Sequence, residues 1–279
     1  MVLTDQVSYD GGIENVQRLP ATDDEFGGVV VNMIEHMDPD VFRTLLKISM
    51  SQWKLQGKKG VWIKLPIDLS NLVDAAVKEG FRYHHAEPTY LMLLNWIPET
   101  INPIPGNASH IARVGAIVLN HKREMLVVQE KMGVLRGLWK ISTGILHEGE
   151  DISAGIVREV KEETGIETEF VEVLAFSQEH KVFFGKSEIL FLCMMRPLSF
   201  DIQIQETEIE AAKWMPLEEY AAQVSGQEQG LRKYITELCI ANIGRNCSGF
   251  TPLPVTLDSD GNKSYIYLNK GDLSECFSI

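Results

Sequence analysis

The segment from Gly144 to Ile166 constrains the fold more than any other stretch, because it indicates where a strand ends and where a helix runs. It reads GILHEGEDISAGIVREVKEETGI. Gly144 permits a tight exit from a strand, and Gly165 supplies the left-handed residue that ends many helices. The segment therefore predicts a strand, a loop and a helix over residues 152–163.

This predicted helix carries its acidic charge on one side. Glu159, Glu162 and Glu163 follow the spacing i, i+3 and i+4, so a helix of about 3.6 residues per turn brings them to one face. The apolar residues of the opposite side are Ile156, Val157 and Val160. Carboxylates stacked in this way repel one another, so we expect a cation to compensate them and the apolar side to pack against a sheet.

Mg²⁺ suits such a face, since hard divalent ions prefer oxygen ligands and commonly join a few carboxylates to substrate phosphates. Arg158 stands beside Glu159 and can hold a neighbouring carboxylate through a forked pair of hydrogen bonds. Glu150, in the loop before the helix, can reach either the carboxylates or a backbone amide. The segment therefore predicts a metal site made of glutamates.

A Pro- and Asn-rich connector, PETINPIPGN, divides the chain. We expect a lead-in over residues 1–26, a small domain over 27–98, the connector over 99–108, a second domain over 109–245 and a C-terminal extension over 246–279. Strands and helices are mixed in both domains, which predicts the α/β (α+β) class.

The first domain is expected to follow the order βαβαββ. Its strands are predicted at 29–31, 61–65, 81–83 and 90–96, with helices that begin at Asp38-Pro39 and at Leu69. This order is similar to an acetyltransferase-like half-domain but lacks a Gly-rich pyrophosphate loop. We therefore expect a packing or homodimer-forming role. His84 and His85 should point to opposite faces of a strand, which favours a structural role over a shared metal.

The second domain begins with a strand over 113–119, a turn over 120–122 and a hairpin partner over 125–129. A short strand over 139–141 leads to Gly144. The later strands are predicted at 170–176, 188–195 and 211–215, and the later helices at 217–223 and 231–240. The stretch 249–267 is β-like or irregular.

Composition argues against several classes of function. The formal net charge is −13, from 26 basic and 39 acidic residues, and so acidic a surface repels nucleic acid and anionic lipid. No apolar run approaches the ~18 residues of a membrane span. The cysteines, Cys193, Cys239, Cys247 and Cys276, form no CxxC pair and suit a reducing compartment. No signal or transit peptide is evident. We expect a cytoplasmic protein without nucleic-acid or membrane partners.

The segment 144–166 resembles the Nudix box, G-x5-E-x7-R-E-U-x-E-E-x-G-U, at every fixed position, with Val160 and Ile166 as the bulky apolar residues. The resemblance implies an α/β/α sandwich over about residues 109–222. It also implies a diphosphatase that acts on a nucleoside diphosphate linked to another moiety, with Mg²⁺ or Mn²⁺ as cofactor.

The same resemblance assigns roles to single residues. Glu159, Glu162 and Glu163 are the implied metal ligands, with Glu150 as a supporting ligand. Arg158 is the residue that orients them. The catalytic base varies among Nudix enzymes, and here it is expected to be Glu163 or Glu208. Glu208 lies among other acidic residues and equally suits an ordinary surface charge.

The chain is also similar, from about residue 27 to 268, to the two-domain plant Nudix hydrolases associated with ADP-ribose and NADH. The similar stretches are KKGVWIKLP from Lys58, EGFRYHHAE from Glu79 and EIEAAKWMP from Glu208. This similarity implies a pyrophosphatase that splits ADP-ribose or NADH into AMP and a phosphorylated remainder.

Four residues are candidates for the substrate pocket. Trp139 and Phe176 could stack on a base, and they suit a packing role as well. Arg136 and Lys140 could bind phosphate or could be charges at the rim of the pocket.

Two features depart from these relatives. Ser142 stands where they usually carry Pro, and their loop before Trp139 is longer than Gly133–Gly137. Both are expected beside the substrate pocket, and they leave open another diphosphate, such as a prenyl diphosphate or a nucleotide sugar. Outside enzymes, the alternative is a nucleotide-sensing interaction protein with vestigial activity.

Overall fold

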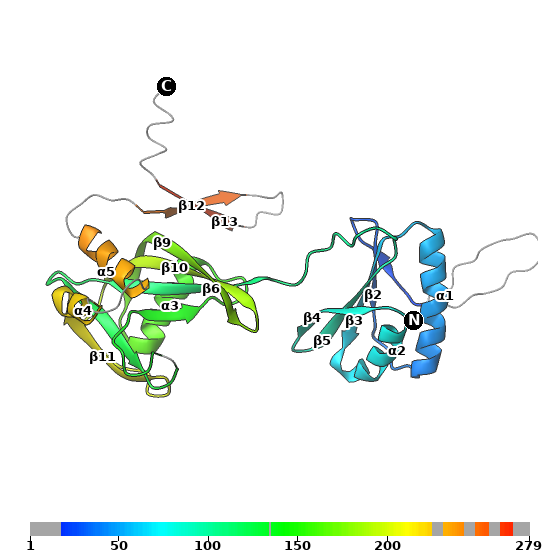
Figure 1. Cartoon of the computed structure of the whole chain (residues 1–279), viewed down its shortest axis with the longest axis horizontal. Coiled ribbons are helices and arrows are strands. Elements are labelled where there is room, and N and C mark those ends of the chain that lie inside the picture. Colours follow the sequence, from blue (N-terminus) through cyan, green and yellow to red (C-terminus); the bar gives the residue numbers. More distant parts are fainter. Residues whose placement is uncertain (1–17, 134, 225–230, 243–248, 257–262, 270–279) are drawn as a thin grey trace, which may run out of the picture. The chain divides into compact units, whose positions relative to one another are not determined.

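A computed structural model describes residues 18–133, 135–224, 231–242, 249–256 and 263–269. The chain divides into two compact units, residues 1–108 and 109–279, whose elements are labelled in Figure 1. Of the predicted features, Cys247, Cys276 and much of the C-terminal extension lie outside these ranges. Within them, no helix is both long enough and apolar enough to cross a membrane.

Unit 1 is built on a five-stranded sheet. Its elements are β1 Thr22–Asp23, β2 Val29–Asn32, α1 Pro39–Leu55, β3 Gly60–Pro66, a 3₁₀ helix Ile67–Leu72, α2 Val73–Lys78, β4 Arg82–Glu87 and β5 Tyr90–Trp96. The strand order is β1-β2-β3-β5-β4, and β2 and β3 pair in parallel. Alternate residues of β3 are buried in one core with Phe42 and Leu46 of α1. The predicted βαβαββ order is confirmed, with β1 added inside the expected lead-in.

Two predictions for unit 1 are wrong in detail. The helix expected from Leu69 begins as a 3₁₀ helix at Ile67, and the backbone of Leu69 is not helical (φ −104°, ψ 19°). The rings of His84 and His85 do not diverge, because a register shift between Tyr83 and His85 breaks the alternation of β4. Their Nδ1 atoms lie 2.7 Å apart.

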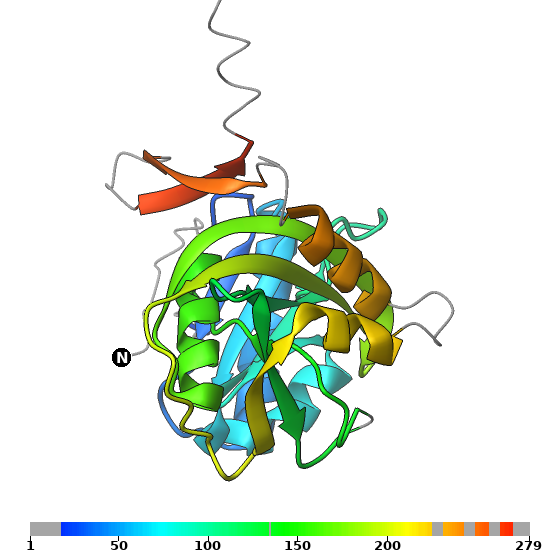
Figure 2. The same cartoon turned by 90° about the vertical axis from the view of Figure 1, so that its left-hand side faces the viewer.

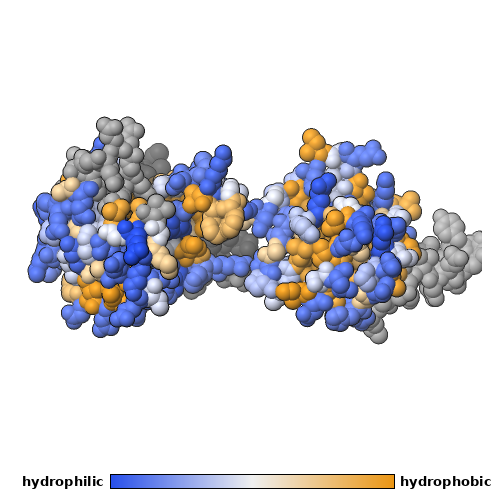
Figure 3. Space-filling view, turned by 60° about the horizontal axis from the view of Figure 1, so that its bottom comes forward, coloured by the Kyte–Doolittle hydropathy of each residue, from blue (hydrophilic) through white to orange (hydrophobic). Residues whose placement is uncertain are grey.

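A cavity of about 600 Å³ lies within unit 1, lined by aromatic side chains that include Trp62, His84 and Trp96 and by the connector residues 103–108. Both units also expose hydrophobic surface, coloured orange in Figure 3, next to hydrophilic surface in blue. In unit 1, Ile67 is 63% exposed. None of the candidate catalytic or metal-binding residues lines this cavity.

Unit 2 contains the remaining elements. They are β6 His110–Val118, β7 Glu124–Glu130, β8 Ser142–Ile145, α3 Ile152–Thr164, β9 Thr168–Phe183, β10 Lys186–Pro197, β11 Ile209–Pro216, α4 Leu217–Val224, α5 Leu231–Asn242, β12 Thr251–Thr256 and β13 Lys263–Leu268. The main sheet has the order β8-β6-β10-β9, with β6 and β10 parallel, and β7 pairs with β11 in a second sheet.

The main sheet of unit 2 has helices on both faces. Ile156 and Val160 of α3 share one core with Val114 of β6. Ile117, on the other face of the same strand, packs in a second core that includes Tyr220 of α4. Figure 2 shows α3 in green on one side of the unit and α4 and α5 in yellow and orange on the other. This is the expected α/β/α arrangement.

The predicted hairpin of 113–119 with 125–129 is wrong. Both edges of β6 are occupied, by β8 and by β10, so β7 pairs with β11 and touches the end of β6 through the single bridge Leu119–Met125. The strand expected at 139–141 is also displaced. Lys140 forms one bridge with Val128, and the regular strand β8 begins at Ser142.

Candidate active site

Helix α3 carries the predicted acidic face and has the predicted ends. It spans Ile152–Thr164 and stops at Gly165, whose φ of 71° is left-handed. A side chain there would need this unfavourable conformation, and its Cβ would lie 2.9 Å from Gln203 Cβ. The buried residues of the helix are Gly155, Ile156, Val160, Glu163 and Thr164. The carboxylate of Glu163 is therefore buried, whereas the side chain of Glu162 is 56% exposed.

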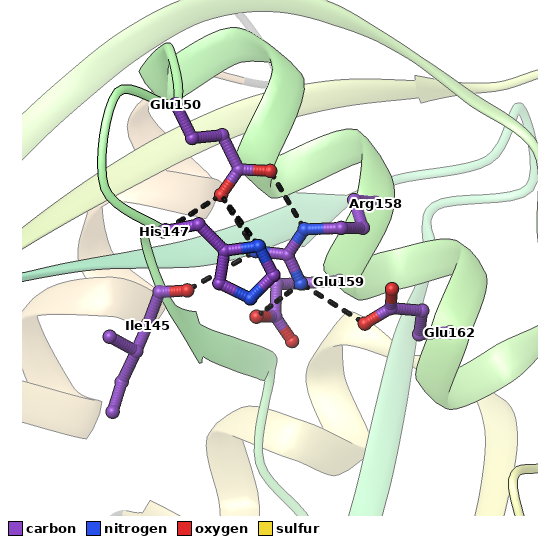
Figure 4. Close-up of polar contacts among 6 residues, drawn as sticks. All are labelled: Ile145, His147, Glu150, Arg158, Glu159 and Glu162. Atoms are coloured by element: carbon purple, nitrogen blue, oxygen red, sulfur yellow. Dashed lines mark hydrogen bonds and ion pairs between the residues drawn. The ribbon is translucent and has the colours of Figure 1, made fainter. Parts of the chain in front are cut away.

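Arg158 joins the carboxylates of the loop and the helix, as Figure 4 shows. Its Nε and Nη2 donate to Oε1 and Oε2 of Glu150 at 2.7 and 2.8 Å. Its Nη1 donates to Glu159 Oε1 at 2.9 Å and to Glu162 Oε2 at 3.0 Å. The predicted fork is thus made with Glu150, eight residues earlier in the sequence. One guanidinium holds three carboxylates.

Glu150 also fixes the loop before α3. Its Oε2 accepts the backbone N–H of His147 at 2.9 Å, the backbone amide contact that the sequence allowed. Hydrogen bonds from Arg158 lower the pKa of Glu150 to about 2, against the opposing effect of burial. Glu150 therefore stays ionised at neutral pH and connects the loop to the carboxylates of the helix.

Glu163 has the opposite electrostatic environment. The residue is 8% exposed, and burial raises the pKa of its carboxyl to about 7, although the nearby Ser142 hydroxyl and Lys140 ammonium oppose this rise. The contact with Ser142 falls short of hydrogen-bond geometry: within the described part of the chain, Ser142 Oγ and Glu163 Oε2 are both buried without a partner. Glu163 thus supplies a buried carboxylate oxygen that the described residues leave unsatisfied.

Strand β8 lies directly against this face of α3. A Cβ on Gly144 would fall 1.8 Å from Cδ of Glu159 and 2.0 Å from its Oε1. Glycine at 144 therefore gives the Glu159 carboxylate the space it occupies, which explains the spacing between this glycine and the helix in the motif.

Lys140 lies inside the unit, at 8% exposure. Its Nζ lies 2.5 Å from Glu130 Oε1 and donates to Thr143 Oγ1 at 3.0 Å. The Lys140 ammonium therefore contacts other protein groups and is not an exposed charge at the rim of a pocket. Its role in phosphate binding stays a prediction. Glu130 is not among the site residues predicted from the sequence. Its position at the end of the buried strand β7 is the signal that could have drawn attention to it.

The two aromatic candidates pack on opposite sides of the main sheet. Trp139 packs against the core of the α4 and α5 side, with Lys213 Nζ 4.9 Å from its ring centroid. Phe176 is 65% exposed and lies beside Phe191, which packs on the α3 side, at a centroid distance of 6.5 Å. The structure does not bring these rings together, so they do not form one stacking site.

Arg136 and Glu208 lie in exposed segments. Arg136 belongs to the turn between β7 and β8, where its backbone N–H donates to Gly133 at 3.3 Å. Glu208 precedes β11, and its backbone carbonyl accepts from Lys131 at 2.8 Å. Among the described residues, its carboxylate forms no ion pair with the box. A part for Glu208 in catalysis stays a prediction.

The site suits a hard divalent cation by its chemistry. Its donors are carboxylate oxygens, and in the part of the chain that the structure describes the buried Oε2 of Glu163 has no hydrogen-bond partner. Within the described ranges, no three acidic, histidine or cysteine side chains converge into a ready-made metal site. Arg158 engages Glu159 and Glu162 here, so binding a cation requires these carboxylates to exchange some of those contacts.

Comparison with known proteins finds relatives along most of the chain. A model of the Nudix hydrolase domain matches residues 19–97, and a model of the NUDIX domain matches residues 109–238. Nudix hydrolase 2 of Arabidopsis thaliana is 54% identical over 258 residues, which cover 91% of this chain and 92% of that protein. Nudix hydrolase 10 of the same plant is 54% identical over 254 residues, 90% of each chain. The Homo sapiens nucleoside diphosphate-linked moiety X motif 6 is 36% identical over 206 residues, 71% of this chain and 65% of that one.

Proposed function

The chain belongs to the Nudix hydrolase family, and from that premise we propose that it hydrolyses the diphosphate linkage of ADP-ribose or NADH. The products are AMP and a phosphorylated remainder. The proposal includes Mg²⁺ or Mn²⁺ as the metal, in keeping with the general use of divalent ions by Nudix hydrolases. The sequence resemblance to plant Nudix hydrolases associated with ADP-ribose and NADH supports the substrate. The name of the human relative supports the wider class of linked nucleoside diphosphates.

The observation that carries this proposal is the excess of carboxylate around a single guanidinium. Arg158 binds Glu150, Glu159 and Glu162, while Glu163 is buried one helical turn beyond Glu159, with an oxygen that no described residue hydrogen-bonds. Such an arrangement costs stability in a metal-free protein. It supports a role in which these oxygens bind a cation.

The roles of the side chains follow from their places. Glu159, Glu162 and Glu163 would hold the ion, and Glu150 supports them by fixing Arg158. When bound, a divalent ion polarises phosphate oxygens and lowers the pKa of water. Water attacks a phosphorus, the bond between phosphorus and the bridging oxygen breaks, and a carboxylate takes the proton. We favour Glu163 over Glu208 as this base, because Glu163 lies among the other carboxylates.

A phosphate-release screen tests the substrate. The full chain is assayed with ADP-ribose, NADH, nucleotide sugars, coenzyme A and prenyl diphosphates, with and without Mg²⁺. We expect metal-dependent turnover that is highest for ADP-ribose or NADH. Preferential cleavage of another diphosphate would overturn the substrate, and absence of any turnover in folded, Mg²⁺-loaded protein would favour the nucleotide-sensing alternative.

Glu162→Gln tests the site. We expect kcat to fall about 100-fold or more while the substrate still binds, since the variant removes a metal-binding charge and little volume. Glu169→Gln is the matched control, because Glu169 is 51% exposed and also pairs with an arginine, Arg196. The control should keep wild-type turnover.

A further inference from the structure

The position of Ser142 relative to α3 carries an inference beyond the role of the box glutamates. Gly144 of β8 faces Glu159, as the 1.8 Å approach of a Cβ at 144 to Glu159 Cδ shows. Residues two apart on a strand share a face and are about 6.6 Å apart, and residues four apart on a helix share a face at about 6 Å. These spacings allow Ser142, two residues before Gly144, to face Glu163, four residues after Glu159. The effect of the Ser142 hydroxyl on the pKa of Glu163 places the two side chains together.

Two unsatisfied oxygens lie at this matched position. Ser142 is 1% exposed and Glu163 is 8% exposed. In the part of the chain that the structure describes, Ser142 Oγ and Glu163 Oε2 both lack a hydrogen-bond partner. Buried polar atoms are nearly always paired, and a hydroxyl can donate where a carboxylate oxygen can only accept. The two atoms are complementary.

We propose that Ser142 is a positioning residue for Glu163, whose Oε2 accepts a hydrogen bond from the Ser142 hydroxyl when the site holds its cation. This bond would hold the Glu163 carboxylate in one orientation for binding the ion. The inference rests on the proposed function for the presence of that ion, and it concerns a residue outside the box.

With this role, Ser142 in place of proline affects the metal site and not the substrate pocket. Proline, which the plant relatives usually carry there, has no hydroxyl to donate. Ser142 was expected beside the substrate pocket, but its side chain is buried and lies close to Glu163 of α3. The residue at this position should therefore change the affinity for the metal and leave the choice among diphosphates unchanged.

Ser142→Ala in the full chain tests this role. Mg²⁺ affinity is measured without substrate, from the rise in melting temperature as Mg²⁺ is added. We expect the apparent Kd for Mg²⁺ to increase about tenfold, as is typical when a residue that orients a metal ligand is lost. The ratio of kcat/KM for ADP-ribose to that for NADH should stay within about twofold of the wild-type ratio. Ser142→Thr, which keeps the hydroxyl, should restore most of the Mg²⁺ affinity.

Thr168→Val is the matched control. Thr168 is 6% exposed, and its Oγ1 is likewise buried without a partner among the described residues. Since it begins β9 instead of facing the α3 carboxylates, its loss should leave Mg²⁺ affinity unchanged. In a Glu163→Gln background, Ser142→Ala should have little further effect, because the acceptor charge is already absent.

Three outcomes would overturn the inference. One is a folded Ser142→Ala variant with wild-type Mg²⁺ affinity, and another is a changed substrate ratio with unchanged Mg²⁺ affinity. The third is an increase in the Kd for Mg²⁺ on Ser142→Ala that is just as large in the Glu163→Gln background. This comparison does not depend on Ser142→Thr, so it also applies if that variant is too bulky to fold. Because Mg²⁺ binding is measured without substrate, a protein that binds Mg²⁺ but cleaves neither ADP-ribose nor NADH would refute the proposed substrate and leave the Ser142 inference standing.

Discussion

Helix α1 of unit 1 and helix α3 of unit 2 each pack an apolar side in a core, but they differ at their beginnings and in their charges. Asp38 caps α1 by accepting the backbone N–H groups of Asp40 and Val41 at 2.9 and 3.2 Å. Asp151, at the same position of α3, makes no capping hydrogen bond with its side chain. The five buried residues of α1 include no charged group, whereas α3 buries Glu163.

The arginines of the two helices show the same contrast. Arg43 of α1 pairs with Glu79, at 2.6 Å from Nε to Oε1. Arg158 of α3 binds three carboxylates, and a fourth, Glu163, is buried nearby. Helix α1 thus has the features that stabilise a helix, while α3 gathers more carboxylates than its one arginine can bind. The difference teaches that α3 is shaped by its site as much as by its packing.

Replacing the two arginines should give the largest contrast. Arg158→Met frees three carboxylates from their common donor, so we expect kcat to fall about 10- to 100-fold in steady-state assays. Arg43→Met should leave kcat unchanged and lower the free energy of unfolding by about 1 kcal/mol at most, since the pair is partly exposed. Equal losses of activity in both variants would remove the distinction between the helices.

Glu163→Gln should stabilise the metal-free protein while it lowers activity. The pKa of Glu163 is about 7 in the fold against an ordinary value of 4.5. The unfolded chain therefore loses this proton first, and the fold loses stability as the pH rises from about 4.5 to 7. The variant removes this penalty, up to about 3 kcal/mol at pH 8.

Denaturant unfolding with a chelator, at about pH 5.5 and about pH 8, measures this effect. The advantage of the variant over the wild type should be larger at the higher pH, and added Mg²⁺ should reverse it, because the ion compensates the wild-type carboxylate. A variant that is less stable than the wild type at both pH values would contradict the prediction.

The helix caps should give the smallest effects. Asp38→Ala removes two hydrogen bonds to the first turn of α1, so we expect the free energy of unfolding to fall by about 1 kcal/mol. Asp151→Ala removes no capping bond, so the free energy of unfolding should fall by only a few tenths of a kcal/mol. The two variants are compared by urea unfolding with Mg²⁺ present, and similar losses in both would show that Asp151 contributes more than its geometry indicates.

Much of α3 was predictable because its information is local. The spacing of Glu159, Glu162 and Glu163 gives a common face, and Gly144 and Gly165 mark the ends of the strand and of the helix. Local information failed where another element decided the outcome. The strand 125–129 looked like a hairpin partner of 113–119, but both edges of β6 were already occupied. The histidines of β4 approached each other because a bulge changed the alternation.

By itself, the sequence determined the family, the acidic face of one helix and the apolar side beneath it, since helical periodicity depends only on residue order. Tertiary structure decided which atoms this face meets. It placed the fork of Arg158 on Glu150, buried Lys140 against Glu130, and brought Ser142 close to Glu163. These contacts join residues from different elements, and their geometry depends on how a strand, a loop and a helix pack, which no pattern along the chain specifies.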